Sequence, residues 1–278
     1  MEYLEFKIKC KPEFTDIIIA ELAEIGFESF LETDFGLEAF MPKDIFERDA
    51  FRNIIDKYAK AADISVMEGT MPKINWNEEW ERHYDPIAIG KDIYVRASFH
   101  PPRADTAYEI IINPKMSFGT GHHATTHLML AFQLTIPHQG KRVIDIGSGT
   151  GILAIMAHKL GAGEIKALDI DNWCVANGNE NFALNGVPGL QMELGTLDEV
   201  KPEGRFDIVL ANINKNVLLE EMSRYASILN NNGSLLLSGF YEHDIEDISS
   251  AAGDQGLHLK ERKTRGEWAA LLLVKPDD

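Results

Sequence analysis

The chain has 278 residues, of which 45% are hydrophobic, a length and composition that suit two globular domains with separate cores. Its 44 acidic and 27 basic side chains give a formal net charge of −17, which disfavours direct binding to nucleic-acid phosphates and suits a basic partner. With two cysteines lacking metal-ligand spacing, no signal-peptide pattern and no apolar run near the ~20 residues of a membrane helix, we expect a cytoplasmic protein without membrane contact.

Residues 1–68 alternate between strand and helix patterns. Apolar and polar residues alternate over 4–10, which predicts a strand with one solvated face, and helical spacing follows over 14–25 until Gly26. Two strands (ESFLETD and GLEAFMP), a second amphipathic helix and a final strand (ADISVME) come next. The order β-α-β-β-α-β predicts a small α+β domain of the ferredoxin-like type. It holds no catalytic constellation, so we expect it to recognise the substrate.

Residues 69–85 form a predicted linker helix. Trp76, Trp80 and Tyr84 recur every four residues and therefore share one helical face. This aromatic stripe either docks the helix onto a neighbouring domain or stays exposed for binding.

Residues 86–278 alternate between buried strands and helices. The runs RVIDIG, EIKALDI, LQMEL, FDIVLANI and, after a predicted turn at NNNG, SLLLSGF read as strands. The chain closes with LHLKERKT and WAALLLV around a tight turn, which predicts an antiparallel hairpin. We therefore expect an α/β domain with a doubly wound, Rossmann-like sheet and an antiparallel hairpin at one edge.

The motif DIGSGTG ends one of these strands and opens a helix. Gly147 and Gly149 permit a sharp turn that lets the backbone approach a ligand, and the helix N-terminus favours a negative group. A dinucleotide fingerprint would need a third glycine where this chain has Ile152. The spacing G-x-G-x-G after Asp145 is instead typical of S-adenosylmethionine enzymes.

Two polar side chains follow later strands at the same predicted edge of the sheet. Asp169 ends the second strand, where a carboxylate can accept hydrogen bonds from both hydroxyls of a ribose. Asp171 more plausibly caps the next helix. Asn212 ends the fourth strand and can hold an amine or the amino-acid part of a cofactor, although a helix cap by Asn212 or Asn214 is the alternative.

A second glycine-rich run, MSFGTGHHATTH, occupies residues 116–127. It either forms an unrelated turn or provides a second wall of the same site. His123 and His127 have the i, i+4 spacing of metal ligands, but no acidic third ligand or H-E-x-x-H pattern accompanies them. We therefore predict no metal site.

These motifs together resemble class I S-adenosylmethionine-dependent methyltransferases, and FGTGHHATT resembles the F-G-T-G-x-H-x-T-T signature of the PrmA family. The family methylates large-subunit ribosomal protein eleven. The W-x-x-x-W-x-x-x-Y-x-P linker, the sequence ANI at 211–213 and the N-terminal domain also match, so the resemblance spans nearly the whole chain. The chain departs from the family where His122 and Ala124 replace a common Thr and Pro, and where Asn214 replaces an apolar residue.

The resemblance implies that S-adenosyl-L-methionine binds between the two glycine-rich runs. The implied cofactor contacts are Phe118, Gly119, Thr120, Thr126, Gly147, Gly149, Asp169 and Asn212, of which Asn212 is also the implied catalytic residue. It further implies methylation of lysine side chains and an N-terminal amine on the ribosomal protein, and we expect a monomer.

Three rival interpretations stay open: a methyltransferase acting on another protein, nucleic acid or a small-molecule amine, a nicotinamide-dependent oxidoreductase, and a degenerate, non-enzymatic binding module.

Overall fold

The computed structural model describes residues 3–33, 35–70, 84–113, 119–187 and 189–277. The chain folds as two compact units, Met1–Tyr84 and Asp85–Asp278. Most of the predicted linker helix 69–85, with Trp76 and Trp80, lies outside the described residues. Within the described part of the chain, no helix is long and apolar enough to cross a membrane.

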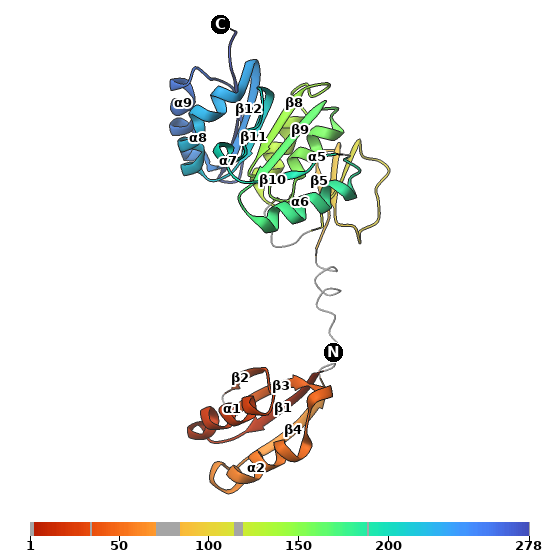
Figure 1. Cartoon of the computed structure of the whole chain (residues 1–278), viewed down its shortest axis with the longest axis vertical. Coiled ribbons are helices and arrows are strands. Elements are labelled where there is room, and N and C mark those ends of the chain that lie inside the picture. Colours follow the sequence, from red (N-terminus) through yellow and green to blue (C-terminus); the bar gives the residue numbers. More distant parts are fainter. Residues whose placement is uncertain (1–2, 34, 71–83, 114–118, 188, 278) are drawn as a thin grey trace. The chain divides into compact units, whose positions relative to one another are not determined.

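The first unit is a four-stranded antiparallel sheet with the strand order β2-β3-β1-β4 and two main helices (Figure 1). Along β1, Phe6 and Ile8 alternate with exposed lysines and join one core with Leu22 of α1 and Phe51 of α2. Both helices therefore cover the same face of the sheet. The elements are β1 (Tyr3–Lys9), α1 (Thr15–Glu24), β2 (Ser29–Thr33), β3 (Gly36–Pro42), α2 (Arg48–Ala62) and β4 (Ser65–Thr70), with short 3-10 turns at Pro12–Phe14 and Lys43–Ile45.

The second unit is built on a seven-stranded sheet with the order β10-β9-β8-β11-β12-β14-β13. The five strands from β10 to β12 are parallel, and β14 pairs antiparallel with both β12 and β13. The sheet strands are β8 (Arg142–Ile146), β9 (Glu164–Asp169), β10 (Met192–Leu194), β11 (Phe206–Asn212), β12 (Leu229–Tyr241), β13 (His258–Arg265) and β14 (Trp268–Val274). The prediction of a mostly parallel sheet with an antiparallel edge hairpin is confirmed.

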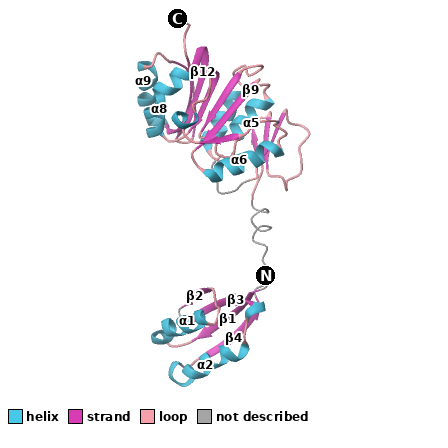
Figure 2. Ribbon diagram, viewed as in Figure 1, coloured by secondary structure: helices cyan, strands magenta, loops and turns pink. Residues whose placement is uncertain are grey.

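Helices cover both faces of this sheet (Figure 2). The neighbouring strand residues Val143 and Ile144 belong to different cores, one shared with α4, α5 and α6 and the other with α8 and α9. This two-sided burial explains why RVIDIG is almost continuously apolar. The helices are α4 (Ala124–Gln133), α5 (Ile152–Lys159), α6 (Asn172–Leu184), α7 (Leu197–Val200), α8 (Lys215–Ile228) and α9 (Ile245–Asp254), with a 3-10 turn at Glu242–Asp244.

The structure differs from the sequence prediction in several places: helices α7 and α9 were not predicted, and two further differences concern strands. A separate three-stranded sheet of β5 (Ile87–Ile89), β6 (Ile93–Arg96) and β7 (Tyr108–Ile111) precedes the main sheet and was not predicted. The segment NNNG, predicted as a turn before a strand, lies inside β12, where Asn232 has φ +61. Asn232 and Gly233 exchange backbone hydrogen bonds with Lys275, which holds the irregular segment against the chain after β14.

Candidate active site

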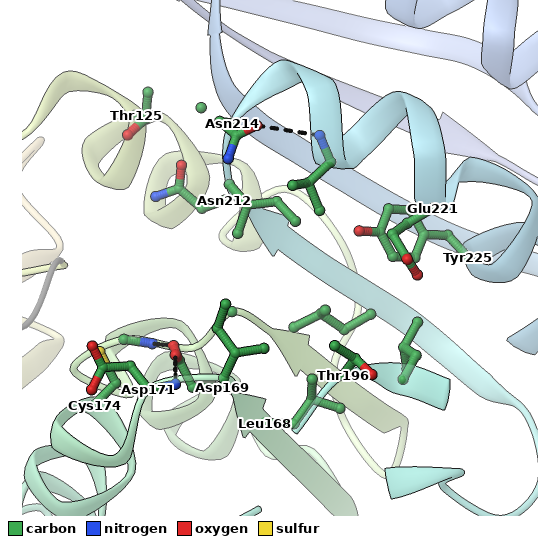
Figure 3. Close-up of a pocket in the computed structure, with 18 of the residues that line it drawn as sticks. Thr125, Leu168, Asp169, Asp171, Cys174, Thr196, Asn212, Asn214, Glu221 and Tyr225 are labelled. Atoms are coloured by element: carbon green, nitrogen blue, oxygen red, sulfur yellow. Dashed lines mark hydrogen bonds between the residues drawn. The ribbon is translucent and has the colours of Figure 1, made fainter. Parts of the chain in front are cut away.

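A cavity of about 760 Å³ opens at the carboxyl ends of β8, β9 and β11. This is the edge where open α/β sheets bind their ligands, and the volume lies in the usual range for small-molecule sites. Strand-end residues Ile146, Asp169 and Asn212 line it, and Figure 3 shows the last two facing one another across the space.

The glycine-rich loop after β8 forms the floor of this cavity. Gly147, Gly149 and Gly151 all have positive φ, at +67, +57 and +81, so the sharp turn predicted from the motif is confirmed. A Cβ on Gly147 would lie 2.5 Å from Cγ2 of Ile213, and both residues line the cavity. The backbone can therefore reach the cavity floor only without a side chain at position 147.

Asp169 is fixed at the rim by two backbone donors. Its Oδ2 accepts a hydrogen bond from Gly149 N at 2.8 Å, and its Oδ1 accepts one from Asp171 N at 3.0 Å. Each carboxylate oxygen has a further lone pair for a ligand hydroxyl. Asp171 also accepts a hydrogen bond from Trp173 N at 2.7 Å, so it caps α6 as predicted.

The two glycine-rich runs touch each other. Thr150 of the loop donates a hydrogen bond to the Gly119 carbonyl at 2.6 Å, and a Cβ on Gly119 would lie 2.9 Å from the same hydroxyl. His123 and Thr125 line the cavity together with Gly147 and Gly149. Both runs therefore contribute walls to one cavity.

Three of the predicted cofactor contacts in the first run, Gly119, Thr120 and Thr126, are not among the residues that line the cavity. Gly119 supports the glycine loop and Thr120 contacts Nδ1 of His122 at 3.3 Å, and neither is among the lining residues. Phe118 lies outside the described residues. Thr126 is fully buried and is not among the lining residues either, although its neighbour Thr125 is.

Asn212 links Thr126 to the cavity. Its Nδ2 donates to the Thr126 hydroxyl at 3.5 Å, which leaves Oδ1 as a buried acceptor with no partner among the residues that the structure describes. A buried carbonyl oxygen without a partner suits a ligand N–H. The alternative role, a helix cap, belongs to Asn214, which accepts a hydrogen bond from Val217 N at 3.2 Å at the start of α8.

The histidines of the first run have structural partners. His123 caps α4 through Nδ1, which accepts from Thr125 N at 3.3 Å, and His127 Nε2 lies 3.1 Å from Nη1 of Arg265. Burial and the nearby Arg265 lower the pKa of His127. Across the described ranges, no group of three His, Cys, Asp or Glu side chains has the arrangement of a metal site.

Asp145, the acidic residue before the glycine loop, is completely buried. Its Oδ2 accepts hydrogen bonds from Ser148 Oγ at 2.5 Å and Ala154 N at 3.2 Å, while Oδ1 has no partner in the described part of the chain. Burial raises the pKa of Asp145 to about 7. The carboxyl group thus stabilises the glycine loop through its hydrogen bonds and is not among the residues that line the cavity.

Several lining residues escaped the sequence interpretation. Trp268 lies at the start of β14, with its ring centroid 4.5 Å from His123 and 4.4 Å from Tyr241. Glu221 and Tyr225 of α8 line the opposite end, near Thr196 (Figure 3). The helical spacing predicts Tyr225 as part of a core-facing stripe, and only the packing of α8 against β11 and β12 shows that Tyr225 also lines the cavity.

Comparisons with known proteins agree with one another. The family model described as ribosomal protein L11 methyltransferase (PrmA) matches residues 3–276. A ribosomal protein L11 methyltransferase from Porphyromonas gingivalis is 44% identical over 258 residues, covering 92% of this chain and 89% of that protein. One from Bacteroides fragilis is 37% identical, covering 99% of this chain and all of that protein. A solved ribosomal protein L11 methylase from Lactobacillus delbrueckii subsp. bulgaricus superposes with a TM-score of 0.64 at 28% identity, covering 70% of this chain and 100% of that chain.

Proposed function

Because the chain belongs to the PrmA family of ribosomal protein L11 methyltransferases, we propose that it methylates lysine side chains and the N-terminal amine of ribosomal protein L11 with S-adenosylmethionine. The observation that carries this proposal is the convergence of the glycine loop, Asp169 and the orphaned carbonyl of Asn212 on one cavity. The residues present fit the cofactor, since they combine a ribose acceptor, a close backbone approach and an apolar lining.

The chain's own residues divide the work of binding. Gly147 and Gly149 let the loop backbone approach the amino-acid part of the cofactor, and Asp169 accepts the ribose hydroxyls. Thr126 acts from behind Asn212, because its hydroxyl accepts the Asn212 amide N–H and so leaves Oδ1 as the atom available to a ligand. The Gly119 carbonyl holds the first run against the loop by accepting from Thr150, while Thr120 contacts His122 within the run.

When bound, S-adenosylmethionine supplies an electrophilic methyl group on a sulfonium centre. The protein must present an uncharged amine, and a free lysine at pH 7 costs about 4.6 kcal/mol to deprotonate. Desolvation in the cavity lowers that pKa. Asn212 Oδ1 then accepts one remaining N–H of the amine and aims its lone pair, so the main contribution of the residue is positioning.

The first unit is the proposed substrate-recognition domain. Its strand order, read as β4-β1-β3-β2, supports a ferredoxin-like fold, and we place the domain boundaries near 1–68 and 86–278 with a linker helix between them. The net charge of −17 suits a basic ribosomal protein better than nucleic acid. We further propose that the protein acts in the cytoplasm as a monomer.

The test uses unmethylated L11 and S-adenosylmethionine with a labelled methyl group, followed by intact-mass analysis. We expect mass steps of one methyl on L11, and peptide mapping that places them on lysine and N-terminal amines. Asn212→Ala should reduce turnover about 100-fold, a loss typical of an orienting group, while the affinity for S-adenosylhomocysteine changes less than tenfold. Full turnover in this variant would contradict the orienting role, and label on other amines would redirect the substrate assignment.

A nicotinamide-dependent oxidoreductase fits the cavity less well. Ile152, where the dinucleotide fingerprint needs glycine, is buried at the start of α5. Tight binding of NADH, measured by fluorescence, would revive that reading.

A further inference from the structure

The cavity has a polar end that neither the ribose nor the methyl-transfer position explains. Tyr225 on α8 is fully buried, yet it lines the cavity, and its hydroxyl has no hydrogen-bond partner among the described residues. A buried hydroxyl without a partner costs free energy unless a ligand completes it. Figure 3 shows this hydroxyl on the side of the ring that faces the cavity, above Thr196 and Leu168.

Glu221 lies one helical turn before Tyr225 and lines the same end. Its Oε1 accepts a hydrogen bond from Arg224 Nη1 at 2.5 Å, while Nη2 of Arg224 contacts Asp198 at 2.6 Å. Arg224 thereby anchors the carboxylate between α7 and α8. Burial and the Glu221 charge raise the pKa of Tyr225, so its hydroxyl stays protonated and can donate.

The space leading to these groups is apolar on both sides. Leu168 and Leu197 line it from the sheet and α7, and Val217 lines it from the first turn of α8. Apolar side chains on opposite walls with polar groups at the far end suit a flat heteroaromatic ring that carries hydrogen-bonding groups on one edge. Asp169, the ribose acceptor, lies on the rim of the same cavity.

We propose that Glu221 and Tyr225 select the adenine base of the cofactor by recognising the ring edge that carries the 6-amino group. This inference rests on the proposed binding of S-adenosylmethionine. The Glu221 carboxylate accepts an N–H of the 6-amino group, and the Tyr225 hydroxyl donates to a ring nitrogen of the same edge. A 6-oxo purine presents an acceptor toward Glu221 and is repelled, because a carboxylate has no proton to donate. The two residues are therefore specificity-determining for the cofactor, separate from the positioning role of Asn212.

The test compares binding of two probes by isothermal titration calorimetry: S-adenosylhomocysteine and its deaminated analogue S-inosylhomocysteine. The wild-type chain should prefer the amino compound by about tenfold or more, the value of one good hydrogen bond lost and one repulsion gained. Glu221→Gln should reduce the preference below about threefold, because the glutamine amide can donate to a 6-oxo group. Tyr225→Phe should weaken S-adenosylhomocysteine about fivefold while leaving the melting temperature of the free protein unchanged or higher.

Asp198→Asn is the matched control. It removes the other acidic partner of Arg224, so a loss of preference there would assign the effect to the ion-pair network rather than to Glu221. A merely structural Tyr225 would lower the melting temperature on substitution and weaken both probes equally, which would overturn the inference. Wild-type binding of both probes with equal affinity would overturn it as well and leave the proposed function standing. If the wild type binds neither probe, the proposed function fails first.

Discussion

At the scale of single residues, Asp145 makes the stability of this fold depend on pH. Its carboxyl group has a pKa of about 7 in the folded chain because burial penalises its charged form, against an ordinary value of 3.8. The unfolded chain therefore releases this proton several pH units before the folded chain does. Stability contributed by the neutral group is complete below pH 4 and is lost as the pH rises to about 7.

Asp145→Asn should remove this dependence. Relative to the wild type, the variant should gain about 3 kcal/mol of free energy of unfolding between pH 5 and pH 7, at 1.36 kcal/mol per pH unit, and little more above the folded-state pKa. Parallel urea titrations at pH 5, 6, 7 and 8 measure the difference. A gap between the two proteins that stays constant with pH would show that Asp145 does not titrate in this window.

Asp207 provides a control, because its pKa is shifted in the opposite direction to that of Asp145. Burial opposes its charge, but hydrogen bonds from Arg142 N and Asn230 outweigh burial and hold the pKa of Asp207 below its usual value. Its contribution is therefore lost only as the pH falls toward that low pKa. Asp207→Asn should differ from the wild type by a constant amount between pH 5 and pH 8.

At the scale of elements, β11 and β12 position Asn212 through a close contact between their ends. Gly239 of β12 has φ +101, and a Cβ there would overlap the backbone carbonyl of Ile213, the residue after Asn212. The neighbouring Ile213 N donates to Ser238 O at 3.1 Å, which keeps the two segments together. A side chain at 239 must therefore displace the peptide that carries the proposed catalytic amide.

Gly239→Ala should lower both stability and turnover. We expect a loss of about 2–4 kcal/mol from backbone strain and overlap, and a fall in turnover of at least tenfold, since an ångström of misplacement can cost more. Gly186→Ala is the control, because φ there is +64 but nothing lies within 4 Å of the added Cβ. Chemical denaturation and L11 methylation rates measure both variants. Equal losses in the two would mean that the Ile213 contact is tolerated.

The elements that could be predicted from the sequence are those whose hydrophobic pattern follows directly from burial in the sheet. RVIDIG and FDIVLANI are apolar because both faces of β8 and β11 are covered, and their short length and β-branched residues favour a strand over a buried helix. The strands β5, β6 and β7 have three or four residues each, too few for a period to emerge. Tyr225 fills a core-facing position in the helical pattern, so its role at the cavity follows only from how α8 crosses the strand ends. Trp268 reaches the site for a similar reason, since the hairpin brings the start of β14 beside α4.

At the scale of the whole molecule, the two units have independent cores. The first unit's core contains residues from Leu4 to Ala62, and the two cores of the second contain residues from Ile89 to Leu273, with no shared member. Each core is closed by helices of its own unit, so neither needs the other to bury its apolar residues. Among the described residues, those that line the cavity run from His123 to Trp268, and all of them belong to the second unit.

A chain that begins at Asp85 should therefore keep its cofactor affinity and lose its protein substrate. Binding of S-adenosylhomocysteine should change less than about threefold, because the lining residues that the structure describes and both supporting cores remain. Methylation of L11 should fall about 100-fold or more, because the linked first unit gives the second an effective substrate concentration near the millimolar range. Adding the separate unit 1–84 at micromolar concentration should not restore methylation, since the high effective substrate concentration depends on the covalent linkage between the two units. Calorimetry and initial methylation rates at low L11 concentration provide the two readouts, and undiminished methylation by the shortened chain would assign substrate recognition to the second unit.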